Sequence, residues 1–368
     1  MKILLIGKYP PMQGGISSKT YWLVKHLKAI GFEYKIVTLN EPDYSTKDIS
    51  SDSKDITIIE KGDAPWHIPE TSLIDDQITH AALETAKTFN PDLVETNYLW
   101  PFCKDALLIS KLIKKPLLIR HAGSDIAKFH KTGNYIDIMD MYFNQAAVIV
   151  TNLSSKAIVT NICNTPEKVH CLQRYVPCPE TFKPAVQPGT ANTCEPFDIL
   201  FAGKINYHWR YKGLELLLKT IKRKNLKALF IIGGKYKSDI KKQIKENQIE
   251  ENIKIVDFVH PEKMPEIYRS CKFVWCWENP GGVEDFSNII WEAIFCNTPC
   301  IVNNITKKKT KAEEMSRNFE ALLLELDEIS LFDFEFKYVT TETNLSEYKE
   351  LLYKKFIDRN IALYKNLL

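Results

Sequence analysis

The chain of 368 residues lacks any apolar run close to the roughly 20 residues that a membrane-spanning helix requires. Its first apolar run, Ile3–Ile6, stops at Gly7 and is too short for the core of a secretory signal. A net charge of only +3 argues against nucleic acid binding by bulk attraction. We therefore expect a cytoplasmic protein, and we leave open a peripheral contact with the inner face of the plasma membrane.

Cysteines are present, but their spacing excludes an ordinary zinc site. The nine cysteines form no C-x-x-C pair, and no His/Cys cluster accompanies the closest spacings, Cys271/Cys276 and Cys296/Cys300. Scattered thiols in a chain of this size indicate a reducing compartment, where they mostly fill the core.

What the chain does contain is a regular alternation of short apolar strands and amphipathic helices. This pattern is typical of parallel sheets covered by helices on both faces. A polar, proline-rich stretch from about Tyr175 to Pro196 interrupts it, as a linker would. We therefore predict a doubly wound domain over residues 1–180 and a second over 197–345. An amphipathic helix over 346–368 is expected to join the first domain.

The expected strands are Ile3–Ile6, Tyr34–Leu39, Leu93–Thr96, Leu117–Arg120, Val148–Thr151, Asp198–Ala202, Ala228–Ile232, Ile253–Phe258, Phe273–Cys276 and Cys300–Asn303. The expected helices are Ser17–Ile30, Leu73–Phe89, Lys104–Ile113, Ile136–Phe143, Leu214–Lys222, Ser238–Asn247, Lys263–Ser270 and one that begins near Ser287.

The most specific pattern is a pair of carboxylates, Glu284 and Glu292, at the start of that last helix. Their separation is just over two helical turns, so both can lie on one face. Ser287 and Asn288 are N-cap candidates, and the helix start favours phosphate while carboxylates bind sugar hydroxyls. The alternative is a pair of solvated glutamates, stabilised by about 0.3–1 kcal/mol at a helix start. That alternative fits Glu292 poorly, because this residue follows an apolar turn.

Four local features follow one another along the chain. They are Gly14-Gly15 after the first strand, Arg120–Asp125 after a later strand, Phe201–Lys204 followed by Lys212-Gly213, and Glu284–Glu292 with Phe286 and Asn288. In this order they resemble retaining glycosyltransferases of the GT-B fold, in particular the family called GT4. A fifth feature, Phe182-Lys-Pro184, is similar to the Phe-x-Pro that ends the first domain of such enzymes.

The resemblance implies an α/β GT-B fold, in which two Rossmann-like doubly wound domains enclose a cleft. It also implies retaining transfer of a sugar from a nucleotide-diphosphate sugar to an acceptor hydroxyl. His121 would lie beside the transferred sugar and the acceptor hydroxyl, and Glu284 would bind hydroxyls of the donor sugar. Glu292 would bind the ribose. The donor-binding residues implied are Gly15, Lys204, Lys212, Phe286, Ser287, Asn288 and Glu292.

Each of these residues also has a plainer interpretation. Gly15 is part of a pair that a tight turn could require, although glycine also lets backbone N–H groups approach a diphosphate. A lone histidine such as His121 is often satisfied by local backbone. Asp125 either steadies His121 or caps the next helix. Lys204 keeps the charge of the arginine usual in the family but loses its bidentate geometry, so Arg210 is a second candidate for that role.

We expect no metal and no cofactor besides the nucleotide-sugar donor. The chain has no Asp-x-Asp, and two lysines could stabilise the departing diphosphate instead. The acceptor is left open among a glycan, a lipid-linked glycan, a protein and a small molecule, and cell-surface glycan or glycoconjugate synthesis is the expected setting. A basic, aromatic helix surface that includes Lys19, Tyr21, Trp22 and Lys25 fits either an acidic bilayer or solvent.

Three other functions remain as alternatives. A non-catalytic sugar-nucleotide-binding protein would share the fold, and the departures from the family at Lys204 and at Gln173–Tyr175 are compatible with it. A Rossmann-type oxidoreductase would need a G-x-G-x-x-G after the first strand, and Glu41 stands without one. An epimerase would need acid and base groups that the sequence does not reveal.

Overall fold

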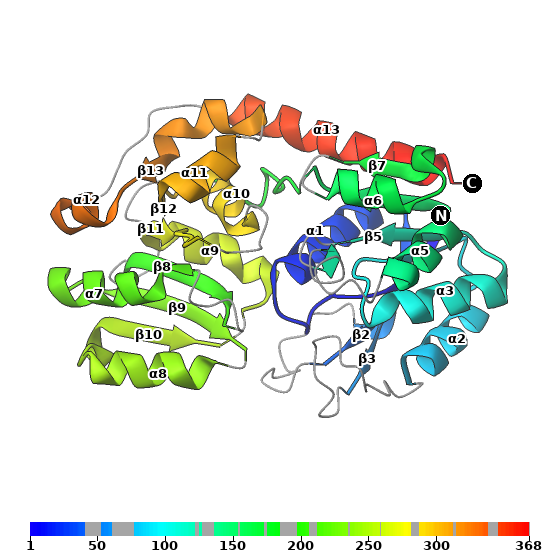
Figure 1. Cartoon of the computed structure of the whole chain (residues 1–368), viewed down its shortest axis with the longest axis horizontal. Helices are drawn as coiled ribbons and strands as arrows, with labels where there is room; N and C mark the ends of the chain where they lie inside the picture. Colours follow the sequence, from blue (N-terminus) through cyan, green and yellow to red (C-terminus); the bar gives the residue numbers. More distant parts are fainter. Residues whose placement is uncertain are drawn as a thin grey trace. The chain divides into compact units, whose positions relative to one another are not determined.

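The chain folds into two compact units. The computed structural model describes residues 1–40, 53–60, 77–121, 125–126, 136–153, 155–172, 175–184, 197–205, 212–234, 236–257, 259–280, 287–311, 314–337 and 345–367. Unit 1 consists of Met1–Tyr175 together with Lys355–Leu368, and unit 2 consists of Val176–Lys354. In each unit, helices cover a parallel sheet (Figure 1).

Unit 1 contains a seven-stranded parallel sheet with the order β3-β2-β1-β4-β5-β6-β7. The central strand β1 is apolar without alternation, because helices cover both of its faces. The strands are β1 (Lys2–Ile6), β2 (Glu33–Leu39), β3 (Ile56–Ile59), β4 (Leu93–Thr96), β5 (Leu117–Arg120), β6 (Val148–Thr151) and β7 (Val169–Cys171). The helices are α1 (Gly15–Ala29), α2 (Gln77–Phe89), α3 (Phe102–Ile113), α5 (Ile136–Gln145) and α6 (Lys156–Ile162), with 3-10 turns η2 (Ser53–Asp55) and η3 (Pro166–Lys168).

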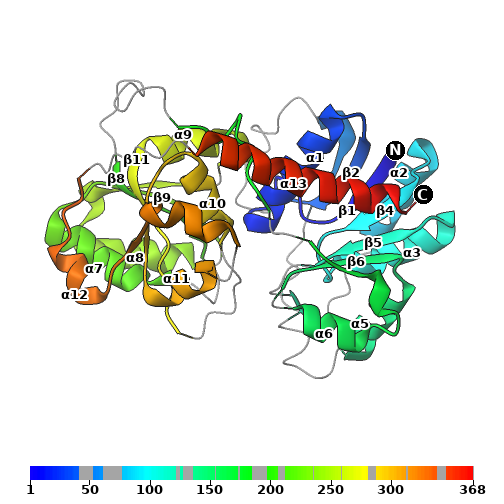
Figure 2. The same ribbon diagram turned by 90° about the horizontal axis from the view of Figure 1, so that it is seen from above.

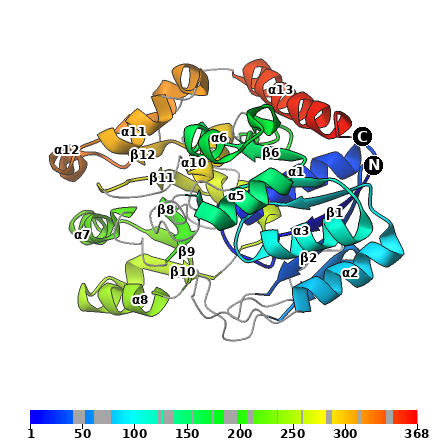
Figure 3. The same cartoon turned by 45° about the vertical axis from the view of Figure 1, so that its right-hand side comes forward.

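The helices of unit 1 bury their apolar stripes against this sheet. Figure 3 shows α2 and α3 side by side, and both contact β1. Their buried residues, which include Ile78, Ala82 and Ile109, join the same core as Leu4 and Val94 of the central strands. Burial of such apolar area, at about 25 cal/mol per Å², is the main source of stability for a layer of this kind.

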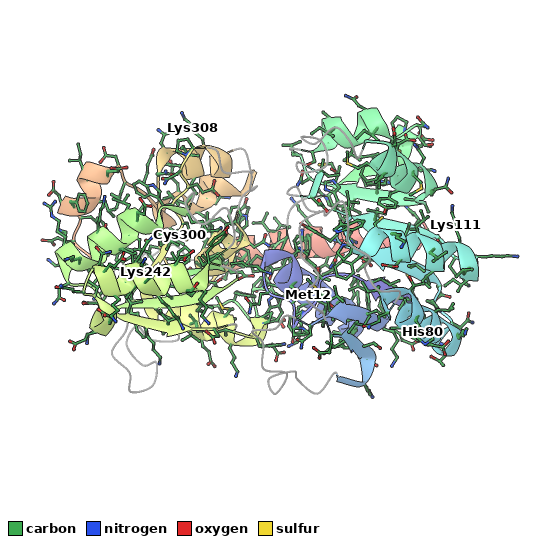
Figure 4. The ribbon with its side chains drawn as sticks, turned by 60° about the horizontal axis from the view of Figure 1, so that its bottom comes forward. Met12, His80, Lys111, Lys242, Cys300 and Lys308 are labelled. Atoms are coloured by element: carbon green, nitrogen blue, oxygen red, sulfur yellow. The ribbon has the colours of Figure 1, made fainter. Side chains whose placement is uncertain are left out.

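Unit 2 contains a six-stranded parallel sheet with the order β10-β9-β8-β11-β12-β13. The strands are β8 (Phe197–Lys204), β9 (Ala228–Gly233), β10 (Ile253–Val256), β11 (Cys271–Trp275), β12 (Cys300–Val302) and β13 (Leu323–Glu325). The helices are α7 (Leu214–Lys224), α8 (Lys237–Glu246), α9 (Met264–Arg269), α10 (Asn288–Phe295), α11 (Asn304–Lys311) and α12 (Glu328–Asp333), with 3-10 turns η5 (Glu250–Asn252), η6 (Pro261–Lys263) and η7 (Glu314–Leu322). Lys242 of α8 and Lys308 of α11 lie at the surface of this unit, whereas Cys300 of β12 is buried (Figure 4).

The last helix, α13 (Ser346–Lys365), belongs to both units. It runs without interruption (Figure 2), and the division between the units falls at Lys354–Lys355 within it. Near its start, the ammonium of Lys349 donates to the Phe295 carbonyl at the C-terminus of α10, at 3.0 Å. Near its end, Tyr364 is fully buried and donates to Glu95 at 2.8 Å. The helix predicted over 346–368 therefore joins unit 1 only from Lys355 onward.

The strands predicted from the sequence all exist, with ends that differ by a few residues. The sequence did not reveal β3, β7, β13, α6, α11 and α12. Strands β7 and β13 have three residues each and end their sheets, so they are too short to show an alternation. Helix α11 is rich in lysine and lacks an apolar stripe. The predicted start of α2 at Leu73 lies outside the described residues.

The predicted basic, aromatic surface on α1 is not formed as expected. Tyr21 and Trp22 are 4% and 6% exposed, so their rings are not available at the surface of the protein. Only the basic part of the pattern, such as Lys25, is exposed. Within the part of the chain that the structure describes, no helix is both long and apolar enough to cross a bilayer.

Candidate functional site

In unit 2, the predicted donor-binding lysines, Lys204 and Lys212, lie at the carboxyl end of β8. Open α/β sheets bind ligands where the strand order reverses, which here is between β8 and β11. Lys204 is the last residue of β8 and pairs in register with Gly233 of β9. The chain reaches Lys212 just before α7, at this same end of the sheet.

The turn that carries Lys212 is held by two tryptophans. Trp275 donates from its indole nitrogen to the Lys212 carbonyl at 2.9 Å, and its ring stacks on Trp277 with an interplanar angle of 8°. Gly213 follows with φ 62°, and a Cβ added there would lie 2.6 Å from Trp277 Cδ1. Only glycine fits both the backbone conformation and the packing.

The Lys212 side chain runs along the end of β8. Its Cδ and Cε atoms lie 3.7 Å from the position that a Cβ on Gly203 would occupy. Gly203 immediately precedes Lys204, so the structure brings the two predicted lysines to one strand end. Both lysines are half-buried. Two cations held in this way can stabilise a diphosphate.

Helix α10 supplies the second half of the predicted donor site. Ser287 is its N-cap residue, in an extended conformation without a side-chain cap, and Asn288 is its first residue. The first N–H groups of any helix lack intrahelical partners, and α10 has no acidic side chain in its first turn. This end therefore favours an anion. Glu284, Phe286 and Arg210 lie outside the described residues, so their predicted roles stay predictions.

Glu292 lies deeper in the protein than its predicted role suggests. It is 3% exposed, and its Oε2 accepts a hydrogen bond from the phenol of Tyr268 on α9 at 2.7 Å. Burial, followed by the neighbouring Glu292, raises the pKa of Tyr268 well above its ordinary value, so the phenol remains a donor at neutral pH. Tyr268 could not be identified from the sequence, because its hydrogen bond to Glu292 depends on how α9 packs against α10.

In unit 1, the loop after β1 is fastened by Asn97, which follows β4. Asn97 accepts a hydrogen bond from the Lys8 backbone N–H at 2.7 Å and donates to the Lys8 carbonyl at 2.7 Å and to Thr20 at 2.8 Å. A Cβ on Gly7 would collide with Asn97, so glycine is required there. Gly15, a predicted site residue, is exposed at the first position of α1, where this loop ends.

His121 follows β5, and its side chain is buried next to the end of β6. Its Nε2 lies 2.6 Å from the hydroxyl of Thr151, the last residue of β6. Its Nδ1 has no hydrogen-bond partner among the described residues, and it lies 3.7 Å from Asp125 Oδ1. The hydrogen bond with Thr151 therefore fixes the position of one ring nitrogen. The register of β5 and β6 places Thr151 beside His121, and only that register would have revealed it.

The carboxylate of Asp125 contacts backbone N–H groups more closely than it contacts His121. Its Oδ1 accepts a hydrogen bond from the Ile126 N–H at 2.9 Å, and its Oδ2 accepts one from the Leu99 N–H at 3.0 Å. The carboxylate thus ties the segment after β5 to the segment after β4. Both contacts are shorter than the 3.7 Å between Asp125 Oδ1 and His121 Nδ1.

A buried polar network lies beneath this end of unit 1. Arg120 donates to Glu95 at 2.7 Å, Tyr364 donates to the other oxygen of Glu95 at 2.8 Å, and Tyr34 donates to Tyr364 at 3.2 Å. Burial alone lowers the pKa of Arg120, but Tyr364 and Glu95 raise it above its ordinary value. The network therefore holds a charged pair inside the core and fixes the end of α13.

The described residues contain no group of three or more His, Cys, Asp or Glu side chains that could hold a metal ion. In the described part of unit 2, Lys204, Lys212 and the N-terminus of α10 are candidates for binding a diphosphate.

Comparison with known proteins identifies the fold. Residues 187–314, which include Lys204, Lys212 and Glu292, match the family described as glycosyl transferases group 1. HepE from Anabaena, in complex with UDP and glucose, matches with a TM-score of 0.67 and 15% identity, over 100% of both chains. A glycosyltransferase from Rickettsia africae matches with a TM-score of 0.62 and 15% identity, over 100% of this chain and 98% of that one.

Sucrose-phosphate synthase from Thermosynechococcus elongatus matches with a TM-score of 0.55 and 15% identity, over 100% of this chain and 96% of that one. No curated protein matches the chain by sequence. The two parallel-sheet units and these likenesses establish the GT-B fold, with two Rossmann-like domains, as the sequence predicted.

Proposed function

We propose that this protein is a retaining glycosyltransferase that moves a sugar from a nucleotide-diphosphate sugar to an acceptor hydroxyl. The main support is the pair Lys204 and Lys212 at the end of β8, together with the N-terminus of α10, which has no acidic side chain in its first turn. The match of residues 187–314 to group 1 glycosyl transferases supports the same activity. HepE is bound to UDP in its crystal structures, so uridine diphosphate sugars are the first donors to test.

The chemistry follows from the charge that develops on the leaving group. As the bond between the sugar and the diphosphate breaks, negative charge grows on the diphosphate. Lys204, Lys212 and the backbone N–H groups of Ser287 and Asn288 stabilise this charge without a metal ion. The departing diphosphate oxygen then takes the proton of the acceptor hydroxyl within a short-lived ion pair, and the acceptor attacks the same face. This route needs no protein nucleophile.

The remaining predicted residues recognise the other groups of the substrates. Glu284 accepts hydrogen bonds from the donor sugar, Glu292 from the ribose, and Gly15 lets backbone approach the donor. His121 orients the acceptor hydroxyl through the ring nitrogen that Thr151 does not engage. We further propose action in the cytoplasm, in cell-surface glycan or glycoconjugate synthesis, with the acceptor and any membrane contact left to experiment.

A binding screen followed by a turnover assay tests this proposal. UDP-, GDP-, TDP- and ADP-sugars should be compared by thermal shift, since a ligand present at 100 times its Kd stabilises the folded state by about 2.7 kcal/mol. Slow release of nucleoside diphosphate from the stabilising donor indicates an enzyme. Stabilisation without release indicates the non-catalytic alternative, and stabilisation by nicotinamide dinucleotides alone indicates the oxidoreductase.

Lys212→Ala supplies the site-directed test. It should reduce release of nucleoside diphosphate by about a hundredfold, because one leaving-group cation is lost. Lys219→Ala is the matched control, since Lys219 is an exposed lysine on the adjacent helix α7. Equal rates in the two variants would contradict the assignment of Lys212.

A further inference from the structure

Glu292 is an acidic residue inside an otherwise apolar helix. The neighbouring residues Ile290, Trp291, Ala293 and Ile294 are all fully buried, and Glu292 is 3% exposed. A buried carboxylate is costly unless it is hydrogen-bonded, so its presence among these side chains calls for a partner and a use.

The partner comes from a different helix. The phenol of Tyr268, which is completely buried on α9, donates to Glu292 Oε2 at 2.7 Å. The backbone of Tyr268 is itself held, because Thr298 donates from its hydroxyl to the Tyr268 carbonyl at 2.9 Å. Thr298 follows α10, and its N–H donates to the Ala293 carbonyl at 2.9 Å. The end of α10 and the end of α9 thus fix each other, with the Tyr268–Glu292 bond between them.

This geometry limits what the carboxylate can do. A carboxylate has about four lone-pair sites, and Tyr268 engages Oε2 from one direction. This hydrogen bond restricts rotation of the carboxylate about its last bond, and so favours one orientation of its remaining lone pairs. When a second residue already orients the side chain that binds a ligand, that side chain loses less conformational freedom on binding. The affinity for the ligand is therefore higher.

We propose that Tyr268 is a positioning residue, which holds the carboxylate of Glu292 in the orientation that accepts the ribose hydroxyls of the donor nucleotide. The inference rests on the proposed function, because it concerns the ribose half of the same donor site. Tyr268 acts through Glu292 and makes no contact with the ligand itself. It determines how strongly the protein distinguishes a ribonucleotide from a nucleotide without ribose hydroxyls.

The test measures ribose discrimination. UDP, GDP and ADP are each compared with their 2′,3′-dideoxy forms by isothermal titration calorimetry, and the tightest pair is kept. The wild-type protein should prefer the ribonucleotide. Tyr268→Phe should lower that preference by about tenfold, the value of one hydrogen bond to a charged group, and leave the affinity for the dideoxy form unchanged.

A double-mutant cycle and a structural control complete the design. Glu292→Gln should lower the preference in the same way, and adding Tyr268→Phe to it should change the preference by less than about twofold, because the two residues act as one unit. Thr298→Val removes the hydroxyl that holds the Tyr268 backbone but keeps the phenol. It should lower Tm and keep the preference for ribose.

The outcomes separate the two proposals. If the wild-type protein binds none of the nucleoside diphosphates, both the proposed function and the role of Tyr268 are overturned. If the wild-type protein binds and prefers the ribonucleotide, but Tyr268→Phe keeps that preference or weakens both forms equally, only the positioning role is overturned. Thermal melts of each variant show whether it is folded.

Discussion

Replacing Gly213 with alanine tests how the turn that carries Lys212 is built. Gly213 has φ 62°, and an added Cβ would lie 2.6 Å from Trp277 Cδ1. The left-handed backbone costs an alanine about 1–2 kcal/mol. Trp277 is stacked on Trp275, with ring centroids 5.2 Å apart, and overpacking against such a fixed ring costs about 1–3 kcal/mol more. We expect Gly213→Ala to lower the free energy of unfolding of unit 2 by about 2–5 kcal/mol.

Urea unfolding followed by circular dichroism and tryptophan fluorescence measures this loss. Gly31→Ala is the matched control, because Gly31 has φ 94° and an added Cβ there meets nothing within 4 Å. It should show the backbone cost alone, about 1–2 kcal/mol. A loss at Gly213 no larger than the loss at Gly31 would refute the packing argument. Sugar transfer by Gly213→Ala should also fall, since the adjacent Lys212 is displaced.

Other predictions concern three further residues. Asn97→Ala removes two hydrogen bonds to Lys8 and one to Thr20 and should destabilise unit 1 by about 2–4 kcal/mol in the urea assay, while Asn97→Asp should lose at least as much, because a buried carboxylate cannot donate to the Lys8 carbonyl. Burial lowers the pKa of Lys349 from 10.5 to about 8, so between these values the unfolded chain keeps a proton that the folded chain has lost. The contribution of Lys349 to stability should therefore rise with pH from 8 to 10.5, by up to about 1.4 kcal/mol per pH unit, and Lys349→Met should lack this rise when unfolding is measured across that range. Thr151→Val should reduce sugar transfer about tenfold by releasing His121, whereas Thr151→Ser should keep it, and equal rates in the two variants would exclude this role.

The fold could be predicted because its strands are distinct in the sequence. Strand β1 has four consecutive buried apolar residues after Lys2, which is typical of a central parallel strand. The edge strands β7 and β13 could not be predicted in the same way. Each has three residues, and what makes them strands is the neighbouring strand, β6 or β12, rather than any pattern of their own.

Some residues of the candidate site could likewise be predicted from the sequence, and others could not. Lys204, Ser287 and Asn288 could be placed because parallel strands end at one edge and a helix start follows from local residue types. Tyr268 and Thr151 could not, because their partners lie 24 and 30 positions away in the sequence. Such pairs depend on strand register and on helix packing, and neither is visible in a single sequence.

The contribution of α13 to both units has a consequence for how the protein is made. Residues 355–367 complete the core of unit 1, yet the ribosome synthesises them after the whole of unit 2. Until Tyr364 emerges, Glu95 lacks one of its two hydrogen-bond donors and Tyr34 lacks its acceptor. The half of the protein that leaves the ribosome first is therefore the last to reach its native state, and a nascent chain arrested within unit 2 would expose an unfinished core to chaperones.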